Sequence, residues 1–573
     1  MAALTRFIEP LLDALPAWTR HPVAVTAGAA LTLVAAAFLY LLVRARSSKF
    51  ANLNGPAPAN WLWGNMLQVI HGQPGEYNTI WFKEFGATVQ VTALLGRKQI
   101  ATGDLQAIGY ILQHSYSFTK PASSNRILES VLGNGLLSSE GHKHRAQRRV
   151  LQPAFSPNHT KNLLPPFWAK SYELQEVWNR MVETGGDWDG PDPPSYTPPV
   201  PEDVVPGACK IDVLNTLNKL SLDILGLAGM NVELGALSNT GSELSDAYRD
   251  MANATHHMSA LMIAEAWFPI LKKIIPSKRR DIVEKNMRIS AAHGMKLLQQ
   301  KKLAIAKERE AGLKQDDDLA GEKDLLSLLI RANTEPDLRE DQKLTDEEVL
   351  NQMTTFMFAG HETTSGTLSW CLEKLAYHPD IQEKLYAELA AVPDPEPTFD
   401  ELMALPYLDK VVREIMRTDN PVIGTMRTPI EDVTLPLGSP VRGRDGKMLD
   451  SVTVPAGTEI FLSVLAVNTS EAVWGPDAKQ FNPDRFDNPA LQKVPGVFGN
   501  LLSFLGGARH CIGYRFAVLE IKAALFVMIR GFTFEPLPSR PKMEREWMIV
   551  QRPVVVGEKK LGPQMPLLVR KRE

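Results

Sequence analysis

The chain has 573 residues, of which 44% are hydrophobic, and a formal net charge of −3. A chain of this length can bury a large core, and the nearly balanced charge gives no reason to expect nucleic acid as a partner. The three cysteines, Cys209, Cys371 and Cys511, are too few for a disulfide framework and fit a reducing compartment.

The N-terminal region contains a long apolar stretch. Residues 22–43 carry no charged side chain, and Arg44 follows directly. The hydrocarbon core of a bilayer requires roughly 20 such residues, whereas the apolar core of a removable signal peptide is shorter, about 7–15 residues. The stretch therefore predicts one transmembrane helix after a tail at 1–21, and a buried hydrophobic helix is the alternative.

The rest of the chain reads as a hinge followed by one domain at 61–573. Residues 44–60 include Asn54-Gly55-Pro56-Ala57-Pro58, which predicts a stiff, extended hinge because proline cannot continue a helix. Residues 88–102 alternate apolar side chains around Gly96-Arg97-Lys98, which predicts a β-hairpin. Later segments mostly have a helical period, with examples at 213–227 and 281–307. Solvated loops or frayed helix ends are expected at 184–207 and 301–323, and a further insert at 434–452.

A basic helix is predicted to begin at Gly141-His142-Lys143-His144-Arg145-Ala146-Gln147-Arg148-Arg149 and to end near Pro153. A run of charge of this kind is usually a solvated face. Its functional interpretation depends on the motifs that follow.

A long helix is predicted to begin at Asp346, because Thr345 and Glu348 have the spacing of a capping box. It continues without proline as far as His378-Pro379, so that about thirty residues would span roughly 45 Å. Within it, Ala359-Gly360-His361-Glu362-Thr363-Thr364 is unusual, because glycine costs about 1 kcal/mol in a helix and threonine hydroxyls can bend it. A glycine for helix packing, with polar neighbours turned to solvent, is the alternative.

Two further motifs suit a network of ion pairs. Glu414-Ile415-Met416-Arg417 places an acid and an arginine on one helix face. Phe481-Asn482-Pro483-Asp484-Arg485-Phe486 supplies a second arginine, and guanidinium and carboxylate groups match geometrically.

The most informative motif is Phe504-Leu505-Gly506-Gly507-Ala508-Arg509-His510-Cys511-Ile512-Gly513. The charge of Arg509 favours a thiolate at Cys511, which can bind a metal. Gly507 and Gly513 permit close backbone approach or positive φ, and Phe504 can shield the sulfur from water. A buried cysteine in a glycine-rich turn is the alternative.

The spacing Phe-x-x-Gly-x-Arg-x-Cys-x-Gly, preceded in order by Ala-Gly-x-Glu-Thr and Glu-x-x-Arg, resembles the cytochrome P450 family of haem-thiolate monooxygenases. The resemblance implies a mainly α fold with a small β-rich lobe, and heme b between the long helix and the loop, with Cys511 as the iron ligand. It assigns Thr363 to hydrogen-bonding dioxygen and Glu362 to relaying protons. The Glu414, Arg417 and Arg485 network would be structural and would lock the cysteine loop.

The resemblance also implies contacts with the haem propionates. Arg148, Arg427 and Arg509 match propionate-binding positions of the family. His144 occupies the place of a tryptophan found in many members, four residues before Arg148; histidine can still donate an N–H and can carry charge. The remaining cations of this helix are expected to face outward: Lys143, Arg145 and Arg149.

The partners follow from the same resemblance. It implies a single-pass anchor in the endoplasmic reticulum membrane with the catalytic domain in the cytosol. No dinucleotide motif or flavin segment is evident in the sequence. Electrons would therefore come from NADPH–cytochrome reductase, with cytochrome b5 as a second donor, docked near Cys511 against Lys143, Arg145 and Arg515.

The substrate is expected to be a lipophilic small molecule, because apolar residues stand at positions that line the pocket in the family: Val422, Ile423, Met548 and Ile549. A terpenoid or other secondary metabolite is our first interpretation, and a fatty acid or xenobiotic is the second. Two rivals are a haem-thiolate isomerase or dehydratase and a non-catalytic haem or lipid carrier. Glu362 and Thr363 argue against both, since neither rival requires an oxygen-handling motif.

Overall fold

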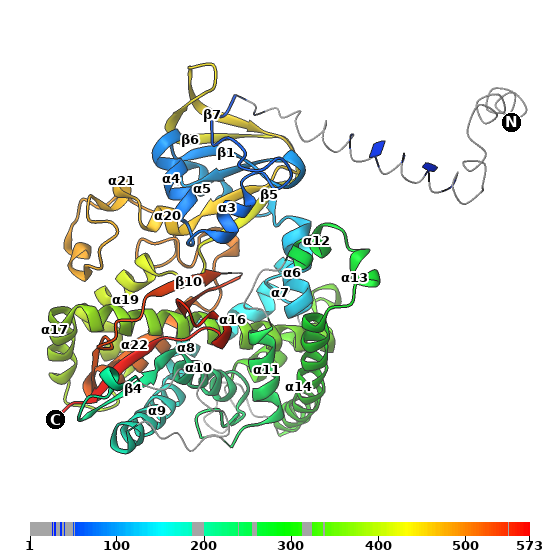
Figure 1. Cartoon of the computed structure of the whole chain (residues 1–573). Helices are drawn as coiled ribbons and strands as arrows, with labels where there is room; N and C mark the ends of the chain where they lie inside the picture. The colour runs from blue at the N-terminus through cyan, green and yellow to red at the C-terminus, as the bar shows by residue number, and fades with distance from the viewer. Residues whose placement is uncertain are drawn as a thin grey trace, which may run out of the picture.

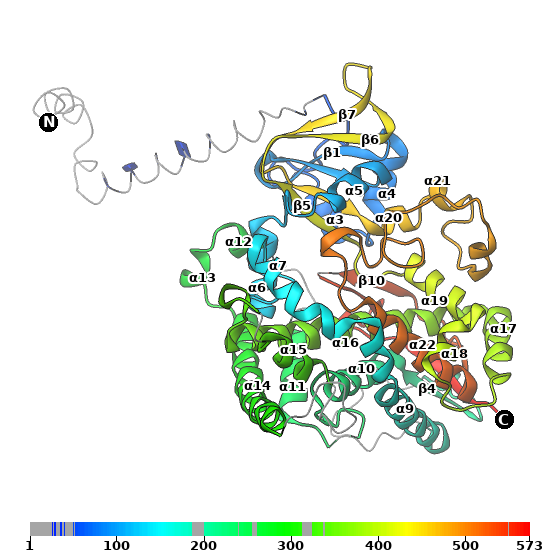
Figure 2. The same ribbon diagram turned by 180° about the vertical axis from the view of Figure 1, so that it is seen from behind.

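Helices make up most of the described chain, and a smaller β-rich lobe lies at one end of the molecule (Figures 1 and 2). The computed structural model describes residues 52–185, 200–238, 240–254, 260–311, 324–335, 338–547 and 549–573, with Phe50 and a few isolated residues between 26 and 39. The predicted fold class is confirmed for this part. The predicted span at 22–43 lies almost wholly outside it, and no helix in the described ranges is long and apolar enough for a membrane crossing.

The lobe is built on a five-stranded sheet with the order β1-β2-β8-β5-β3. β1 pairs antiparallel with β2, with Thr88 opposite Thr102, so the predicted hairpin at 88–102 is confirmed. The insert at 434–452 is an antiparallel ribbon of β6 and β7. The strands are β1 (Thr88–Thr92), β2 (Lys98–Thr102), β3 (Phe118–Thr119), β5 (Gly424–Pro429), β6 (Val433–Arg442), β7 (Met448–Val454) and β8 (Ile460–Ser463).

The helical body is organised around α16 (Asp346–Tyr377), whose predicted capping box at Thr345 and Glu348 is present. Its 32 residues span about 48 Å at 1.5 Å per residue. α10 (Val213–Met230) packs along it, and a Cβ on Gly360 would lie 2.7 Å from the Leu225 side chain. Gly360 therefore permits the close approach of these two helices.

The other helices lie in the helical body around this pair or, as α3, α4 and α5 do, beside the strands of the lobe (Figure 1). They are α3 (Met66–His71), α4 (Glu76–Phe85), α5 (Leu105–Gln113), α6 (Ala122–Leu132), α7 (Gly141–Leu151), α8 (Pro157–Asn162), α9 (Leu164–Thr184), α11 (Glu243–Asn253), α12 (Ala260–Trp267), α13 (Leu271–Ile274), α14 (Lys278–Glu310), α15 (Leu325–Asn333), α17 (Pro379–Ala390), α18 (Phe399–Ala404), α19 (Pro406–Thr418), α20 (Val464–Asn468), α21 (Glu471–Trp474) and α22 (Tyr514–Gly531). Two small antiparallel sheets complete the body: β4 (Ala208–Asp212), β12 (Pro566–Lys571) and β9 (Phe532–Glu535) form one, and β10 (Met543–Trp547) and β11 (Gln551–Val555) the other.

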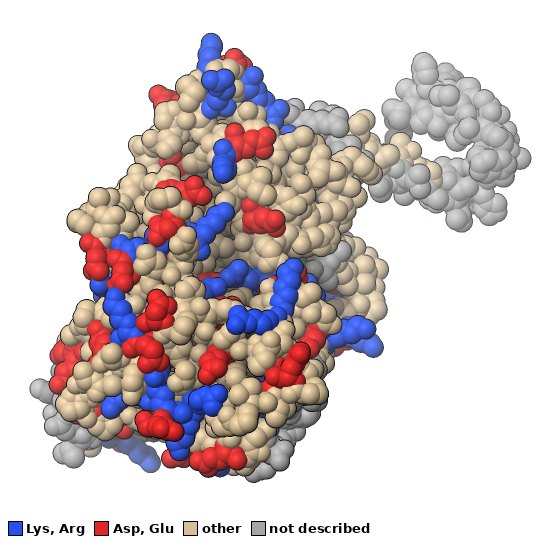
Figure 3. All heavy atoms as spheres, turned by 60° about the vertical axis from the view of Figure 1, so that its left-hand side comes forward, with Lys and Arg blue, Asp and Glu red and all other residues tan. Residues whose placement is uncertain are grey.

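The charged run at 301–323 begins as the end of α14, in keeping with the helical period predicted for 281–307, but Lys301 is not solvated as predicted. Its first ten residues continue α14, and Lys301 is buried and pairs with Asp324 at 2.9 Å. Asp324, 23 residues further along the chain, is the partner that allows Lys301 to be buried. On the face shown in Figure 3, acidic and basic side chains are interspersed rather than segregated, in keeping with the balanced net charge.

Candidate active site

Cys511 lies in a loop between a short 3-10 turn (Gly507–Arg509) and α22. Its backbone N–H donates to the Phe504 carbonyl at 2.9 Å, and its own side chain is exposed, so that its sulfur is accessible to a ligand. Gly507 has φ +67°, and a Cβ there would lie 1.9 Å from the Leu112 carbonyl oxygen of α5. Only glycine therefore allows the loop to lie against α5. Gly513 has φ −89°, so the positive φ that the sequence permits at this glycine is absent.

The electrostatics of Cys511 differ from the sequence prediction. Although the residue is exposed, the protein atoms packed around its thiol partly desolvate it and raise the pKa of the thiol, while the backbone N–H of Gly513 and the charge of Arg148 oppose this rise. The Arg148 guanidinium donates to the His510 carbonyl at 2.8 Å and contacts the His510 ring. The cation that favours the thiolate is thus Arg148 rather than the predicted Arg509, because the latter turns toward α7.

Two buried cations, Arg427 and Arg509, and the partly buried Lys120 gather around one carboxylate. Arg509 and Lys120 both pair with Glu140, and Lys120 does so at 3.3 Å. Burial, and next to it the charges of Arg427 and Arg509, lowers the pKa of Lys120 to about 8, although Glu140 opposes this. Burial and the charge of Arg509 also lower the pKa of Arg427 to about 10. Because buried charges require partners, three cations facing one carboxylate leave a positive excess that fits the two propionates of heme b.

The sequence did not predict Lys120, because a single lysine after a short strand has no distinguishing pattern. His144 was predicted and is buried beside the same cations. Burial, followed by repulsion from Arg509 and Lys120, lowers its pKa to about 3. The lowered pKa favours the neutral ring, which keeps one N–H donor, and the proposed contact of His144 with a propionate stays a prediction. The Tyr116 hydroxyl lies 3.2 Å from its Nδ1.

The polar motif of α16 divides between two environments. The half-buried Thr363 donates its hydroxyl to the Ala359 carbonyl at 2.7 Å, the back-bond expected of a threonine in a helix. Glu362 is buried and forms an ion pair with Arg552 of β11. His361 is also buried, with its Nδ1 2.7 Å from the Met357 carbonyl oxygen.

Glu362 and Arg552 both line a cavity of about 800 Å³. Its wall includes α10, α11 and the segment 559–563, with polar side chains such as Asn218 and Ser245. The exposed Leu561 is among its lining residues. Sequence reasoning missed Arg552, which is 190 residues from its partner along the chain.

An apolar cluster lies beside the motif. Val131 and Leu132 of α6 pack with Phe358 of α16 in a cluster apart from the main core, and Leu128 and Ile549 pack against it. Of the other predicted pocket residues, Ile423 is buried, Val422 is half-buried and Met548 lies outside the described residues.

The structure brings Glu414, Arg417 and Arg485 together. Glu414 accepts two hydrogen bonds from Arg417, both at 2.8 Å, and one from Arg485 Nε at 2.9 Å. Arg417 also donates to the Asn468 carbonyl at 2.7 Å. The Asn468 side chain donates to Ser503 Oγ at 2.9 Å, immediately before Phe504. This chain of contacts connects the network to the cysteine loop.

Comparison with known proteins agrees with this geometry. The cytochrome P450 family model matches residues 54–557. The chain is 38% identical over 565 residues to cytochrome P450 monooxygenase 128 of Postia placenta. The aligned region covers 96% of this chain and 98% of that protein. The chain is also 38% identical to cytochrome P450 monooxygenase 205 of the same fungus, with coverages of 95% and 96%. Cytochrome P450 monooxygenase claP of Ampulloclitocybe clavipes is 32% identical, with coverages of 94% and 98%.

Proposed function

The chain belongs to the cytochrome P450 family, and from this premise we propose that it is a membrane-anchored monooxygenase that oxidises a lipophilic small molecule. Family membership establishes a haem-dependent monooxygenase with a cysteine thiolate ligand. When bound, heme b supplies the chemistry that activates dioxygen. The observation that carries the proposal is the accessible Cys511 sulfur beside a buried cluster with an excess of cations.

The side chains divide the work of binding and proton transfer. Cys511 provides the sulfur ligand, and Lys120, Arg427 and Arg509 neutralise the propionates. Glu362 takes up protons from the polar cavity that it lines, after separating from Arg552. Thr363, the next residue of α16, holds a proton at Oγ1, where its hydroxyl can exchange the Ala359 carbonyl for another acceptor.

The proposed substrate class is supported by the uncharged, apolar character of the cluster of Val131, Leu132, Phe358 and Ile549, which lies next to the polar motif of α16. Our first interpretation is a terpenoid or other secondary metabolite, supported by similarity to fungal monooxygenases. A fatty acid or xenobiotic is the second.

The membrane anchor is supported by an exposed apolar face. Trp61, Phe268, Ile270 and Ile274 have exposed fractions of 74%, 43%, 59% and 68%. Two contacts place these residues on one side of the molecule. The Leu95 N–H donates to the carbonyl of Leu62, the neighbour of Trp61, at 2.7 Å. Arg97, two residues after Leu95, lies 4.4 Å from the ring centroid of Trp267, the neighbour of Phe268. An apolar face close to the chain segment that follows residues 22–43 suits a domain resting on a bilayer of the endoplasmic reticulum.

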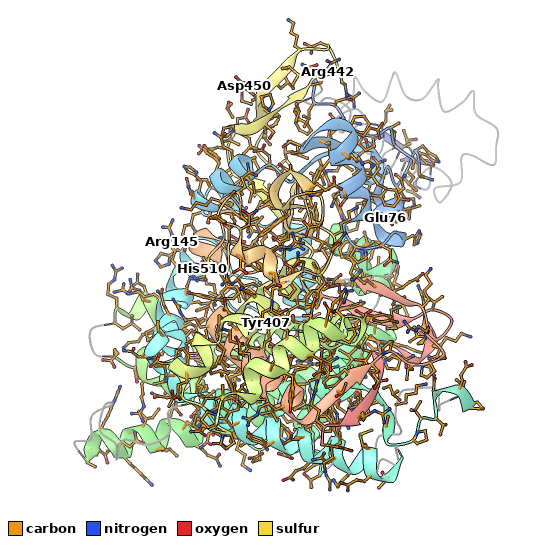
Figure 4. The ribbon with its side chains drawn as sticks, turned by 90° about the vertical axis from the view of Figure 1, so that its left-hand side faces the viewer. Glu76, Arg145, Tyr407, Arg442, Asp450 and His510 are labelled. Carbon is orange, nitrogen blue, oxygen red and sulfur yellow. The ribbon has the colours of Figure 1, made fainter. Side chains whose placement is uncertain are left out.

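The electron donor is proposed to dock over the cysteine loop. Figure 4 shows Arg145 of α7 close to His510 at the surface. Lys143, Arg145 and Arg515 are exposed, so this face presents positive charge to an acidic partner such as NADPH–cytochrome reductase or cytochrome b5.

Co-expression with NADPH–cytochrome reductase and a panel of terpenoids, fatty acids and xenobiotics tests the proposal. We expect NADPH consumption that requires dioxygen and yields a product heavier by one oxygen atom. An isomerase or dehydratase would convert substrate without consuming NADPH, and a carrier would consume no NADPH and convert no substrate. Either result would overturn the monooxygenase function.

A further inference from the structure

Four cationic side chains converge on a small cavity beside the exposed apolar face. Arg126 comes from α6, Lys272 from α13, and Arg279 and Arg280 from the first turn of α14. The cavity measures about 30 Å³, enough for about two water-sized groups. Glu265 of α12 is its one carboxylate among the described lining residues. None of these side chains has a part in the site built on Cys511.

The hydrogen bonds leave positive charge unmatched. Arg280 uses the carboxylate, with its Nη1 3.0 Å from Glu265 Oε1. Arg126 and Arg279 donate through Nε only to carbonyl oxygens, those of Ala266 at 2.7 Å and Ala254 at 2.8 Å. Nη2 of Arg279 is buried and has no hydrogen-bond partner among the described residues. A buried guanidinium N–H without an acceptor among the described residues leaves a place for an acceptor such as a bound anion.

The helix geometry gives a second, independent indication. α14 begins at Lys278, so three consecutive cations and then one acid, Asp281, occupy its first turn, which leaves an excess of positive charge there. The positive end of the helix dipole repels cations at this position and attracts anions. An anion bound between α14 and α6 would offset that repulsion by attracting both the cations and the helix N-terminus. The planar guanidinium groups suit the oxygens of a phosphate.

The surroundings select the kind of phosphate. Arg280 Nη2 donates to the Ile275 carbonyl at 2.9 Å, and the neighbouring Ile274 and Ile270 are exposed. The cationic cavity thus lies at the margin of an apolar face, where a molecule with both a phosphate and acyl chains meets both surfaces. We propose that this cavity binds the phosphate of an anionic phospholipid headgroup. The choice of a lipid over free phosphate rests on the membrane attachment proposed above.

Occupancy would connect lipid composition to α6. The bound phosphate would join Arg126 of α6 to the cations of α13 and α14. α6 also carries Val131 and Leu132 of the apolar cluster, so that a lipid at Arg126 would restrain the helix that packs against Phe358 of α16.

The test uses the detergent-solubilised full-length holoenzyme and two probes, dihexanoyl phosphatidic acid below its micelle concentration and inorganic phosphate. Wild type should bind the lipid at least about tenfold more tightly than phosphate, and Arg126→Gln with Arg279→Gln should weaken lipid binding by about tenfold or more. The matched control is Arg288→Gln, an 81% exposed arginine on the same helix, which should bind as wild type does.

The thiolate-haem spectrum checks that the double variant is folded, and Arg279→Lys provides a milder change that should weaken binding less. Equal lipid binding by wild type and the double variant would overturn the site. Equal affinity of wild type for the two probes would overturn the lipid assignment. Neither measurement uses NADPH or substrate, so a failure here is distinct from a failure of the proposed monooxygenase function.

Discussion

Replacing Glu414 by glutamine should destabilise the fold and loosen the cysteine loop. Glu414 is fully buried, and besides three bonds from two arginines it accepts the Asn482 N–H at 2.8 Å. Glutamine keeps the volume but removes the charge, which leaves Arg417 and Arg485 buried around a neutral amide. Removing one partner of a buried ion pair costs about 3–5 kcal/mol.

The expected thermal shift follows from the size of the domain. An unfolding entropy of about 2.1 cal/mol/K per residue gives roughly 1 kcal/mol/K for about five hundred residues, so Tm should fall by about 3–5 °C. The control is Glu383→Gln. Glu383 is 56% exposed and pairs with Arg572 at 2.8 Å, so its loss should cost about 0–1 kcal/mol and shift Tm by less than about 1 °C.

Thermal unfolding followed by circular dichroism at matched scan rates measures the shift. The reduced carbon-monoxide spectrum reports on the loop, because Asn468 connects the network to Ser503. Glu414→Gln should lose part of the red-shifted Soret band that marks thiolate ligation. A Tm within about 1 °C of the control, together with an intact band, would refute the structural role of the network.

Four further predictions concern the residues around the haem site, a buried carboxyl group and the orientation of the domain at the membrane. Cys511→Ser should abolish the red-shifted Soret band, because a hydroxyl does not ionise near neutral pH, and a variant that keeps the band would show that another residue is the ligand. Thr363→Ala should retain haem and NADPH consumption but release peroxide instead of product, and an unchanged ratio of product to NADPH would contradict the proton-holding role. Burial raises the pKa of Glu520 from 4.5 to about 8, so the folded state binds this proton more tightly than the unfolded state, and stability should be lost as pH rises from about 4.5 to 8. Glu520→Gln should flatten this part of the Tm–pH curve, and identical curves for variant and wild type would disprove this role of Glu520. The exposed sequons Asn158 and Asn253 should be free of glycan if the domain is cytosolic, and a glycosidase-sensitive mass shift at either would place the domain in the lumen.

The sequence determined the features that depend on neighbouring residues. The capping box starts α16 where Thr345 and Glu348 predict, because both bonds close within one helical turn. The spacing of Glu414 and Arg417 placed both on one helix face for the same reason. The motif around Cys511 indicated a thiolate ligand because residue type and order alone carry that chemistry, and Gly507 has the positive φ that the motif allows.

The tertiary structure decided which distant groups share one environment. Arg552 reaches Glu362 from another sheet, Lys120 joins Arg427 and Arg509 around Glu140, and Arg148 rather than Arg509 supplies charge to the thiol. It also lowers the pKa of His144, since the imidazole is buried among cations. Burial and through-space charge depend on how segments pack, and a single sequence does not encode those distances in any local pattern.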